Sequence, residues 1–177
     1  MKRWPGVRTG LPRGGFSLVE MMAATAIMAM VMGSVVVVVR SGYAVWNAFE
    51  QDIDVAENAY AVLQHFVRQM RQAQDVTAIT VASNTAGSLS FMNASGVVQT
   101  WSRNGGTSDV TFNNGTTTHL LARSIGALTF VGYKADGVTP TTVVNEIQMV
   151  KCTAQVTLTQ GGGTTRTVSA TAWMRAW

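Results

Sequence analysis

The stretch Phe16-Ser17-Leu18-Val19-Glu20 opens a run of 24 residues, 16–39, whose only formal charge is Glu20. At about 1.5 Å per residue, a helix of that length measures roughly 36 Å, enough to cross a bilayer with some tilt. Four of the chain's 13 basic residues precede position 15, and Arg40 directly follows the run. Because basic flanks stay in the cytoplasm, we expect residues 1–15 there, a membrane-spanning helix over 16–39, and the rest of the chain on the far side.

A secretory signal peptide is the main alternative for this segment. Such a peptide has an apolar region of about 7–15 residues and ends in a cleavage site of small residues. Here the apolar run is longer, and Met32-Gly33-Ser34 matches that site only loosely. The sequence therefore favours a retained single-pass anchor in the cytoplasmic membrane.

Glu20 is the unusual residue of the apolar run. A carboxylate at the centre of a membrane helix costs about 2.5–3.5 kcal/mol on insertion scales, and it costs less near the end of the span. In one interpretation the side chain simply reaches the cytoplasmic interface. In the other, the charge is kept for a partner that arrives after insertion.

The residues before the run distinguish these interpretations, because Arg13-Gly14-Gly15-Phe16-Ser17-Leu18-Val19-Glu20 resembles the processing site of type IV pilins and type II secretion pseudopilins. In that family a prepilin peptidase cuts after the glycine, on the cytoplasmic side, and methylates the new terminal residue. The resemblance implies that Gly15 precedes the scissile bond, that Phe16 becomes the methylated terminus, and that Glu20 serves assembly. It implies as partners the prepilin peptidase, other pilin or pseudopilin subunits, a membrane assembly platform and membrane lipid.

Small residues recur at every fourth position of the run, at Thr25, Ala29 and Gly33. On a helix they share one face, and small faces allow helices to pack closely in lipid. Chance is the alternative, because alanine and threonine are common in this segment. The pattern predicts a helix-packing face.

Beyond Arg40 an amphipathic pattern continues the helix over residues 40–75. The apolar residues step by three and four along the chain: Val45, Phe49, Ile53, Ala56, Tyr60, Leu63, Val67 and Met70. No proline interrupts residues 16–75, so we expect one helix of about 60 residues. We expect the apolar stripe to face the protein's own sheet.

After Asp75 the sequence becomes rich in Thr, Ser, Gly and Val with an alternating pattern that predicts strands. The predicted strands are 76–82, 88–93, 97–103, 109–113, 118–122, 127–133, 146–159 and 165–175. The last two should form a long hairpin with one apolar face, made of Val150, Cys152, Ala154, Val156 and Leu158 on the first strand and Val168, Ala170, Ala172 and Met174 on the return strand. We therefore predict an α+β fold, a long N-terminal helix packed on an antiparallel β-rich domain over residues 76–177.

Charge and motif content give no support for catalysis or nucleic-acid binding. Residues 16–177 carry nine basic and nine acidic residues, so the basicity belongs to the short leader. His65 and His119 show no ligand spacing, Cys152 falls in a predicted strand, and the glycines at 161–163 lack the Lys-Ser/Thr of a phosphate loop. We expect no enzyme activity, no metal site and no nucleic-acid partner.

Calcium is the one ion that the sequence leaves open. Asp109 with Asn113 and Asn114, or Asp136 with Glu146, would offer the oxygen ligands that calcium takes, but the spacing fits no defined loop. We therefore expect no cofactor.

The order of the C-terminal part also resembles the larger minor members of the pilin family. Residues Ile125–Phe130 precede a Tyr133-x-x-Asp136-Gly137 turn, and a closing hairpin ends near Arg175, as in W-type minor pilins or J-type pseudopilins. The resemblance implies a minor pilin or pseudopilin of a type IV pilus or type II secretion system, with its C-terminal domain periplasmic or extracellular. The alternatives are a single-pass membrane-anchored β-rich binding or enzymatic domain, and a DNA-uptake pseudopilin.

Overall fold

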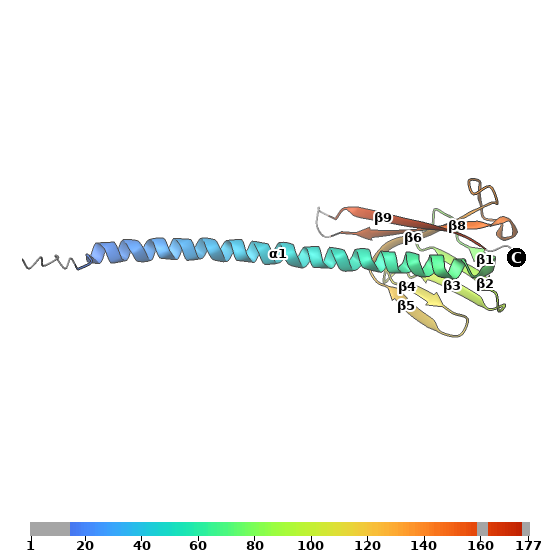
Figure 1. The fold of residues 1–177 in the computed structure, drawn as a ribbon, viewed down its shortest axis with the longest axis horizontal. Helices are drawn as coiled ribbons and strands as arrows, with labels where there is room; N and C mark the ends of the chain where they lie inside the picture. The colour runs from blue at the N-terminus through green and yellow to red at the C-terminus, as the bar shows by residue number, and fades with distance from the viewer. Residues whose placement is uncertain (1–14, 159–162, 175–177) are drawn as a thin grey trace, which may run out of the picture. The chain divides into compact units, whose positions relative to one another are not determined.

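The computed structural model describes residues 15–158 and 163–174 (Figure 1). The chain divides into two compact units, Met1–Val45 and Trp46–Trp177. Helix α1, Leu18–Met70, begins in the first unit, ends in the second and has 53 residues. It ends earlier than residue 75, because the Gln72 N–H bonds the Gln69 carbonyl at 2.9 Å in a tighter turn and Ala73 already starts the first strand.

In the described residues, nine strands form two antiparallel sheets instead of the single sheet expected. The five-stranded sheet has the order β1-β2-β3-β4-β5, with β1 Ala73–Ile79, β2 Ser88–Asn93, β3 Val98–Arg103, β4 Val110–Asn113 and β5 Thr118–Ala122. The four-stranded sheet has the order β7-β6-β8-β9, with β6 Ile125–Tyr133, β7 Pro140–Thr141, β8 Met149–Thr157 and β9 Thr165–Trp173. One long helix packed on antiparallel sheets confirms the predicted α+β class.

The start of the expected strand 146–159 was wrong. A 3₁₀ helix, η1, occupies Val144–Glu146, and β8 begins at Met149. The short strand β7 was not predicted, since two residues beginning with a proline give no alternating pattern. Residue 159 and Arg175, the predicted ends of the last two strands, lie outside the described residues.

The predicted closing hairpin is confirmed, and its predicted apolar residues share one face. Val150 pairs with Ala172, Cys152 with Ala170, and Ala154 with Val168. The β8 members of this face are fully buried, and their β9 partners are buried or packed against the core. The alternation of apolar and polar residues fixed which face turned inward, because a slip of one residue would have exposed every one of them.

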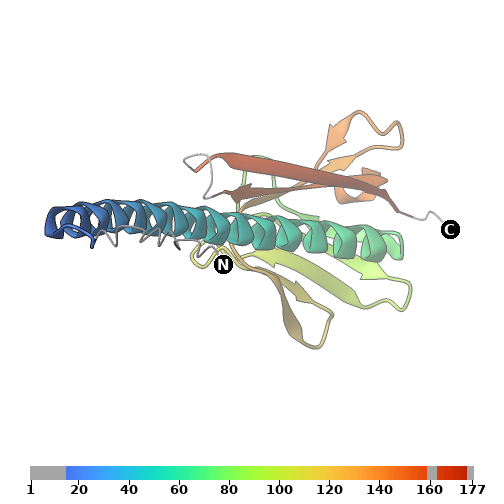
Figure 2. The ribbon, with the colours of Figure 1, turned by 60° about the vertical axis from the view of Figure 1, so that its left-hand side comes forward.

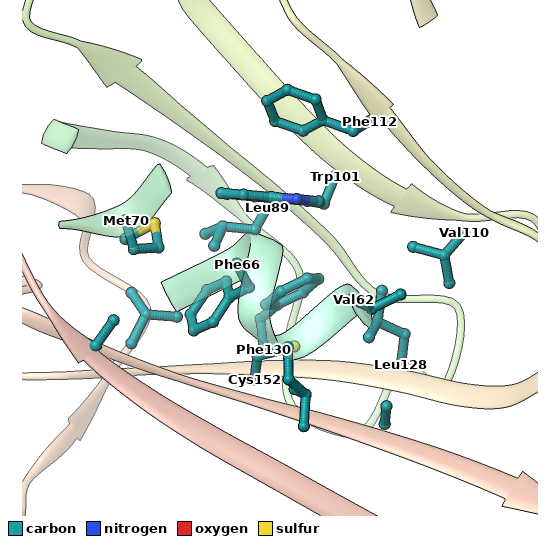
Figure 3. Close-up of a cluster of buried hydrophobic side chains, with 14 of the residues drawn as sticks. Val62, Phe66, Met70, Leu89, Trp101, Val110, Phe112, Leu128, Phe130 and Cys152 are labelled. Atoms are coloured by element: carbon teal, nitrogen blue, oxygen red, sulfur yellow. The ribbon is translucent and has the colours of Figure 1, made fainter. Parts of the chain in front are cut away.

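The core lies where the C-terminal part of α1 meets both sheets (Figures 1 and 2). The Phe66 ring lies edge-on to the Trp101 ring of β3, with centroids 5.6 Å apart, and 6.0 Å from the Phe130 ring of β6 (Figure 3). The Trp101 ring in turn stacks on Phe91 of β2 at 4.7 Å. One helical side chain thus joins the aromatic groups of the two sheets.

The predicted apolar stripe of the helix was correct at its C-terminal end and wrong upstream. Leu63 and Met70 are buried, but the exposed fractions of Val45, Phe49 and Ile53 are 59%, 57% and 43%. The face that packs in the core is a different one, made of Ala59, Val62, Leu63, Phe66 and Met70. The upstream residues stay exposed because, among the described residues, core contacts on α1 begin only at Val55.

Candidate functional site

The predicted processing junction lies just before the helix begins. Gly15, Phe16 and Ser17 adopt irregular backbone, and α1 starts at Leu18. Gly15 is exposed, and 83% of the Phe16 surface is exposed. A peptide bond in exposed, non-helical backbone is open to a protease, whereas a bond inside a helical turn is not.

Ser17 and Glu20 form a capping box at this helix start. The Ser17 N–H donates to Glu20 Oε2 at 3.0 Å, and the Val19 N–H donates to Ser17 Oγ at 3.3 Å. Two of the backbone donors that lack a partner in the first turn are therefore satisfied by side chains. Glu20 also places a negative charge at the positive end of the helix dipole.

Sequence reasoning missed this role of Glu20. The signal was present, because Ser17-x-x-Glu20 before an apolar run is the sequence signature of a capping box. The carboxylate therefore has a local structural task in addition to the assembly task that the resemblance implies. Any test of assembly must keep the cap intact.

The first part of α1 exposes nearly all of its apolar side chains. In the described part of the chain, α1 is the one helix long and apolar enough to cross a membrane. Its hydroxyl groups are satisfied within the helix: Thr25 Oγ1 donates to the Met22 carbonyl at 2.9 Å, and Ser34 Oγ donates to the Val31 carbonyl at 2.7 Å. The segment thus presents an apolar surface and hides its polar groups, as lipid requires.

The predicted packing face remains a prediction. Thr25, Ala29 and Gly33 lie on α1 at four-residue intervals and are exposed. A Cβ atom added at Gly33 would meet nothing within 4 Å, so the space beside this glycine is open. Because the Thr25 hydroxyl already bonds within its own helix, close approach of backbones is the property that this face offers.

Comparison with known proteins bears on this segment. Residues 12–36 match the family model of the prokaryotic N-terminal methylation motif. The match includes the Gly15–Phe16 junction, the capping box and the first turns of α1, and it supports the resemblance to type IV pilin-like proteins. No curated protein and no solved structure matches the chain. The motif and the apolar helix fit a single-pass, membrane-anchored protein.

The calcium ligands considered from the sequence do not assemble into a site. The Thr139 hydroxyl donates a hydrogen bond to Asp136, and the Thr139 and Val138 N–H groups donate to it at 2.9 Å. These bonds, that of the hydroxyl first, lower the pKa of Asp136 to about 2. Glu146 pairs instead with Lys134 Nζ at 2.9 Å. In the described ranges, no three His, Cys, Asp or Glu side chains group closely enough to hold a metal ion.

Asn113 and Asn114, from the other group of predicted calcium ligands, form hydrogen bonds within the turn between β4 and β5. Asn113 Oδ1 accepts from the Gly115 N–H at 2.7 Å, and Asn114 Oδ1 accepts from the N–H groups of Thr116 and Thr117. These side chains shape the β4–β5 connection, which explains why Asn residues occur there.

Of the histidine and cysteine considered for catalysis, His65 is half-buried and Cys152 is fully buried. His65 Nδ1 accepts a hydrogen bond from Trp101 Nε1 at 3.1 Å, and its ring lies 4.5 Å from the Phe112 ring. Burial, and secondarily the charge of Arg68, lower the pKa of His65 below its ordinary value. Burial likewise raises the pKa of the Cys152 thiol, which lies on β8 and is buried in the core.

Proposed function

We propose that this chain is a prepilin-like subunit, cut after Gly15, methylated at Phe16 and assembled through α1 into a type IV pilus or type II secretion pseudopilus. The observation that carries the proposal is the methylation motif over residues 12–36, near whose start an exposed glycine–phenylalanine bond precedes the helix. The long apolar helix beyond it and the β-rich domain at its other end have the layout that such a subunit needs.

The chemistry at the new terminus supports an assembly role for Glu20. Cutting after Gly15 creates an α-ammonium group near the edge of the bilayer, four residues from the carboxylate. When the helix enters a bundle of other helices, the carboxylate loses water and is costly unless a cation pairs with it. The ammonium of Phe16, its own or a neighbour's, is such a cation.

We further propose that the chain is a minor, W-type or J-type subunit without enzymatic activity, whose body lies in the periplasm or outside the cell. Its partners would be the prepilin peptidase, other subunits and a membrane assembly platform. A membrane-anchored binding or enzymatic domain is the rival proposal. Such a tether needs neither the Gly15–Phe16 junction nor Glu20 inside the apolar run, whereas an assembly subunit uses both.

Intact mass and N-terminal sequencing of membrane-extracted protein test the proposal. We expect a chain that begins at Phe16 and carries one methyl group. Gly15→Leu should leave the precursor uncut, while the matched variant Gly33→Ala, where an added Cβ meets nothing within 4 Å, should be processed normally. A mature terminus near Ser34 would instead reveal an ordinary signal peptide and overturn the proposal.

A further inference from the structure

Two asparagine–glycine pairs occur in the chain, Asn104-Gly105 between β3 and β4 and Asn114-Gly115 between β4 and β5. Such a pair can react internally, because the glycine nitrogen can attack the side-chain amide of the asparagine and glycine has no side chain to hinder the approach. The reaction needs an unoccupied N–H group as nucleophile, and it is helped by hydrogen-bond donors at the oxygens where negative charge develops. The two pairs differ in whether the structure supplies these.

At Asn104 both the side-chain oxygen and the main-chain oxygen accept a hydrogen bond. The Gly106 N–H donates to Asn104 Oδ1 at 2.9 Å, and the Ser108 N–H donates to the main-chain carbonyl of Asn104 at 3.0 Å. The first bond stabilises the charge that gathers on Oδ1 when the side-chain carbon is attacked. The second stabilises the deprotonated form of the peptide between residues 104 and 105, because much of its negative charge lies on that carbonyl oxygen.

The nucleophile of this first pair is unoccupied. Among the described residues, the Gly105 N–H has no hydrogen-bond partner, and both Asn104 and Gly105 are exposed to water. A Cβ atom added at Gly105 would meet only Ala86 Cβ, at the ordinary contact distance of 3.8 Å. The peptide therefore has room to turn towards the side chain that it attacks.

The second pair has its nucleophile bound. The Gly115 N–H donates to Asn113 Oδ1 at 2.7 Å, and this bond stabilises the neutral peptide over its deprotonated form. Gly115 is also closely packed, since an added Cβ atom would overlap the Val97 side chain. Two backbone N–H groups of the turn do polarise the side-chain carbonyl of Asn114, but no unoccupied nitrogen is available to attack it.

We propose that Asn104 is a site of spontaneous deamidation in the folded protein. Gly105 N forms a bond to Asn104 Cγ while its proton passes to water, the Cγ–Nδ2 bond breaks, and ammonia leaves with a proton taken from water. A second water molecule then opens the resulting succinimide ring at either carbonyl, which gives aspartate or isoaspartate at position 104. The reaction consumes water, releases ammonia and needs no other protein, so it is independent of the proposed function.

The modified residue lies where the two sheets are joined. Arg103 Nε donates to the Ile125 carbonyl at 2.6 Å, and the Ile125 N–H donates to the Ser108 carbonyl at 3.0 Å. The β3–β4 loop of the first sheet thus holds the start of β6 in the second. Isoaspartate lengthens the main chain of this loop by a carbon atom, and either product adds a negative charge next to Arg103.

Peptide mapping of the purified full chain tests the proposal. Folded chain, and chain unfolded in guanidinium chloride, are incubated for several days in the same mildly alkaline buffer and then digested with trypsin at mildly acidic pH. Because no Lys or Arg lies between the two pairs, a single tryptic peptide that ends at Arg123 contains both of them. Mass spectrometry with electron-transfer fragmentation then assigns deamidation and isoaspartate to each position.

In the folded chain we expect Asn104 to deamidate about tenfold faster than Asn114, because a hydrogen bond on the nucleophile changes the barrier by about that factor. In the unfolded chain the two should react at similar rates, since glycine follows each. Asn113→Ala removes the acceptor of the Gly115 N–H, so it should accelerate deamidation at Asn114 and leave Asn104 unchanged. Asn104→Gln is the matched control, because its longer side chain must close a larger ring and should hardly react.

Three results would overturn the inference. Equal rates at the two asparagines in the folded chain would show that the hydrogen bonds do not select the site. An unreacted Asn104 in the folded chain, with both asparagines reacting in the unfolded chain, would show that folding protects this pair as well. An unchanged rate at Asn114 in the Asn113→Ala variant would show that the bond on the Gly115 N–H is not what protects the second pair.

Discussion

At the residue scale, Glu20 combines a helix cap with a charge inside an apolar segment. Its Oε2 accepts the Ser17 N–H, and glutamine can make the same bond without the charge. We therefore expect Glu20→Gln to be inserted, cut and folded normally but to enter filaments poorly, because the carboxylate that would pair with an α-ammonium is missing. The measurement is the fraction of subunit crosslinked to its neighbours, compared with wild type.

Glu20→Ala serves as the comparison variant, because it removes the cap as well as the charge. If Glu20→Ala and Glu20→Gln lose incorporation equally, the charge is what matters. If Glu20→Gln assembles like wild type, the carboxylate only caps the helix and reaches the interface, and its assembly role is refuted.

His65 gives the domain a pH dependence whose sign follows from its hydrogen bond. Nδ1 must be unprotonated to accept the Trp101 N–H, and burial followed by Arg68 lowers the pKa of His65 below 6.5. The unfolded chain therefore binds this proton more readily, so the stabilisation is complete above about pH 6.5 and is lost as the pH falls below that value.

We expect the free energy of unfolding to fall between about pH 7.5 and about pH 5 by more in wild type than in His65→Gln, whose amide oxygen accepts the same N–H without titrating. Asp136 and Glu146 have lowered pKa values, so their contribution is lost only in more acidic solution. Chemical denaturation at both pH values measures the difference. Equal slopes in the two proteins would show that His65 does not control the pH response.

At the element scale, the two ends of the helical stripe should respond differently to truncation. Leu63 is 5% exposed and belongs to the core, so Leu63→Ala should lower the free energy of unfolding by about 2–5 kcal/mol. Phe49 is 57% exposed, so Phe49→Ala should change it by no more than about 0.5 kcal/mol. Urea denaturation of both variants gives the comparison. A large loss in Phe49→Ala would mean that the sheets cover more of α1 than the structure shows.

The sequence predicted the type of each element better than the face that each one buries. The period of three and four identified the helix, but apolar residues occur on two adjacent faces of α1. The face through Phe49 and Ile53 continues into Tyr60, while the buried face runs through Ala59, Val62 and Phe66. Periodicity cannot choose between them, because the choice depends on how far the sheets extend along the helix.

Strand pairing shows the same limit. Alternation predicted which faces of β8 and β9 turn inward, and Cys152 and Ala154 do share a face with Ala170 and Val168. It did not give the register, because a shift of two residues keeps the same faces inward. The division into two sheets could not be predicted either, because it depends on the connection between β5 and β6, where Ser124 adopts a φ of 60°. A serine in the left-handed region carries no sequence signal that distinguishes it from an ordinary turn residue.

At the scale of the whole molecule, the chain contains a unit that needs lipid or neighbours and a unit with its own core. In α1, the apolar side chains before Val45 are exposed, whereas the buried residues described in the structure all lie in Trp46–Trp177. A fragment that begins at about residue 43 should therefore be soluble and folded. Far-ultraviolet circular dichroism and a cooperative thermal transition would show this, and aggregation of the fragment would mean that its core needs the rest of α1.

The same fragment should be monomeric in solution. Anchoring confines copies to one plane in one orientation, and this raises their effective concentration to the order of millimolar, so a weak contact suffices there. The fragment lacks both this confinement and the exposed apolar side chains of residues 18–39. Sedimentation velocity at about micromolar concentration, far below that range, should show a single monomeric species. A tight dimer at micromolar concentration would indicate a contact independent of the membrane, and the anchor would then not be what assembles the subunits.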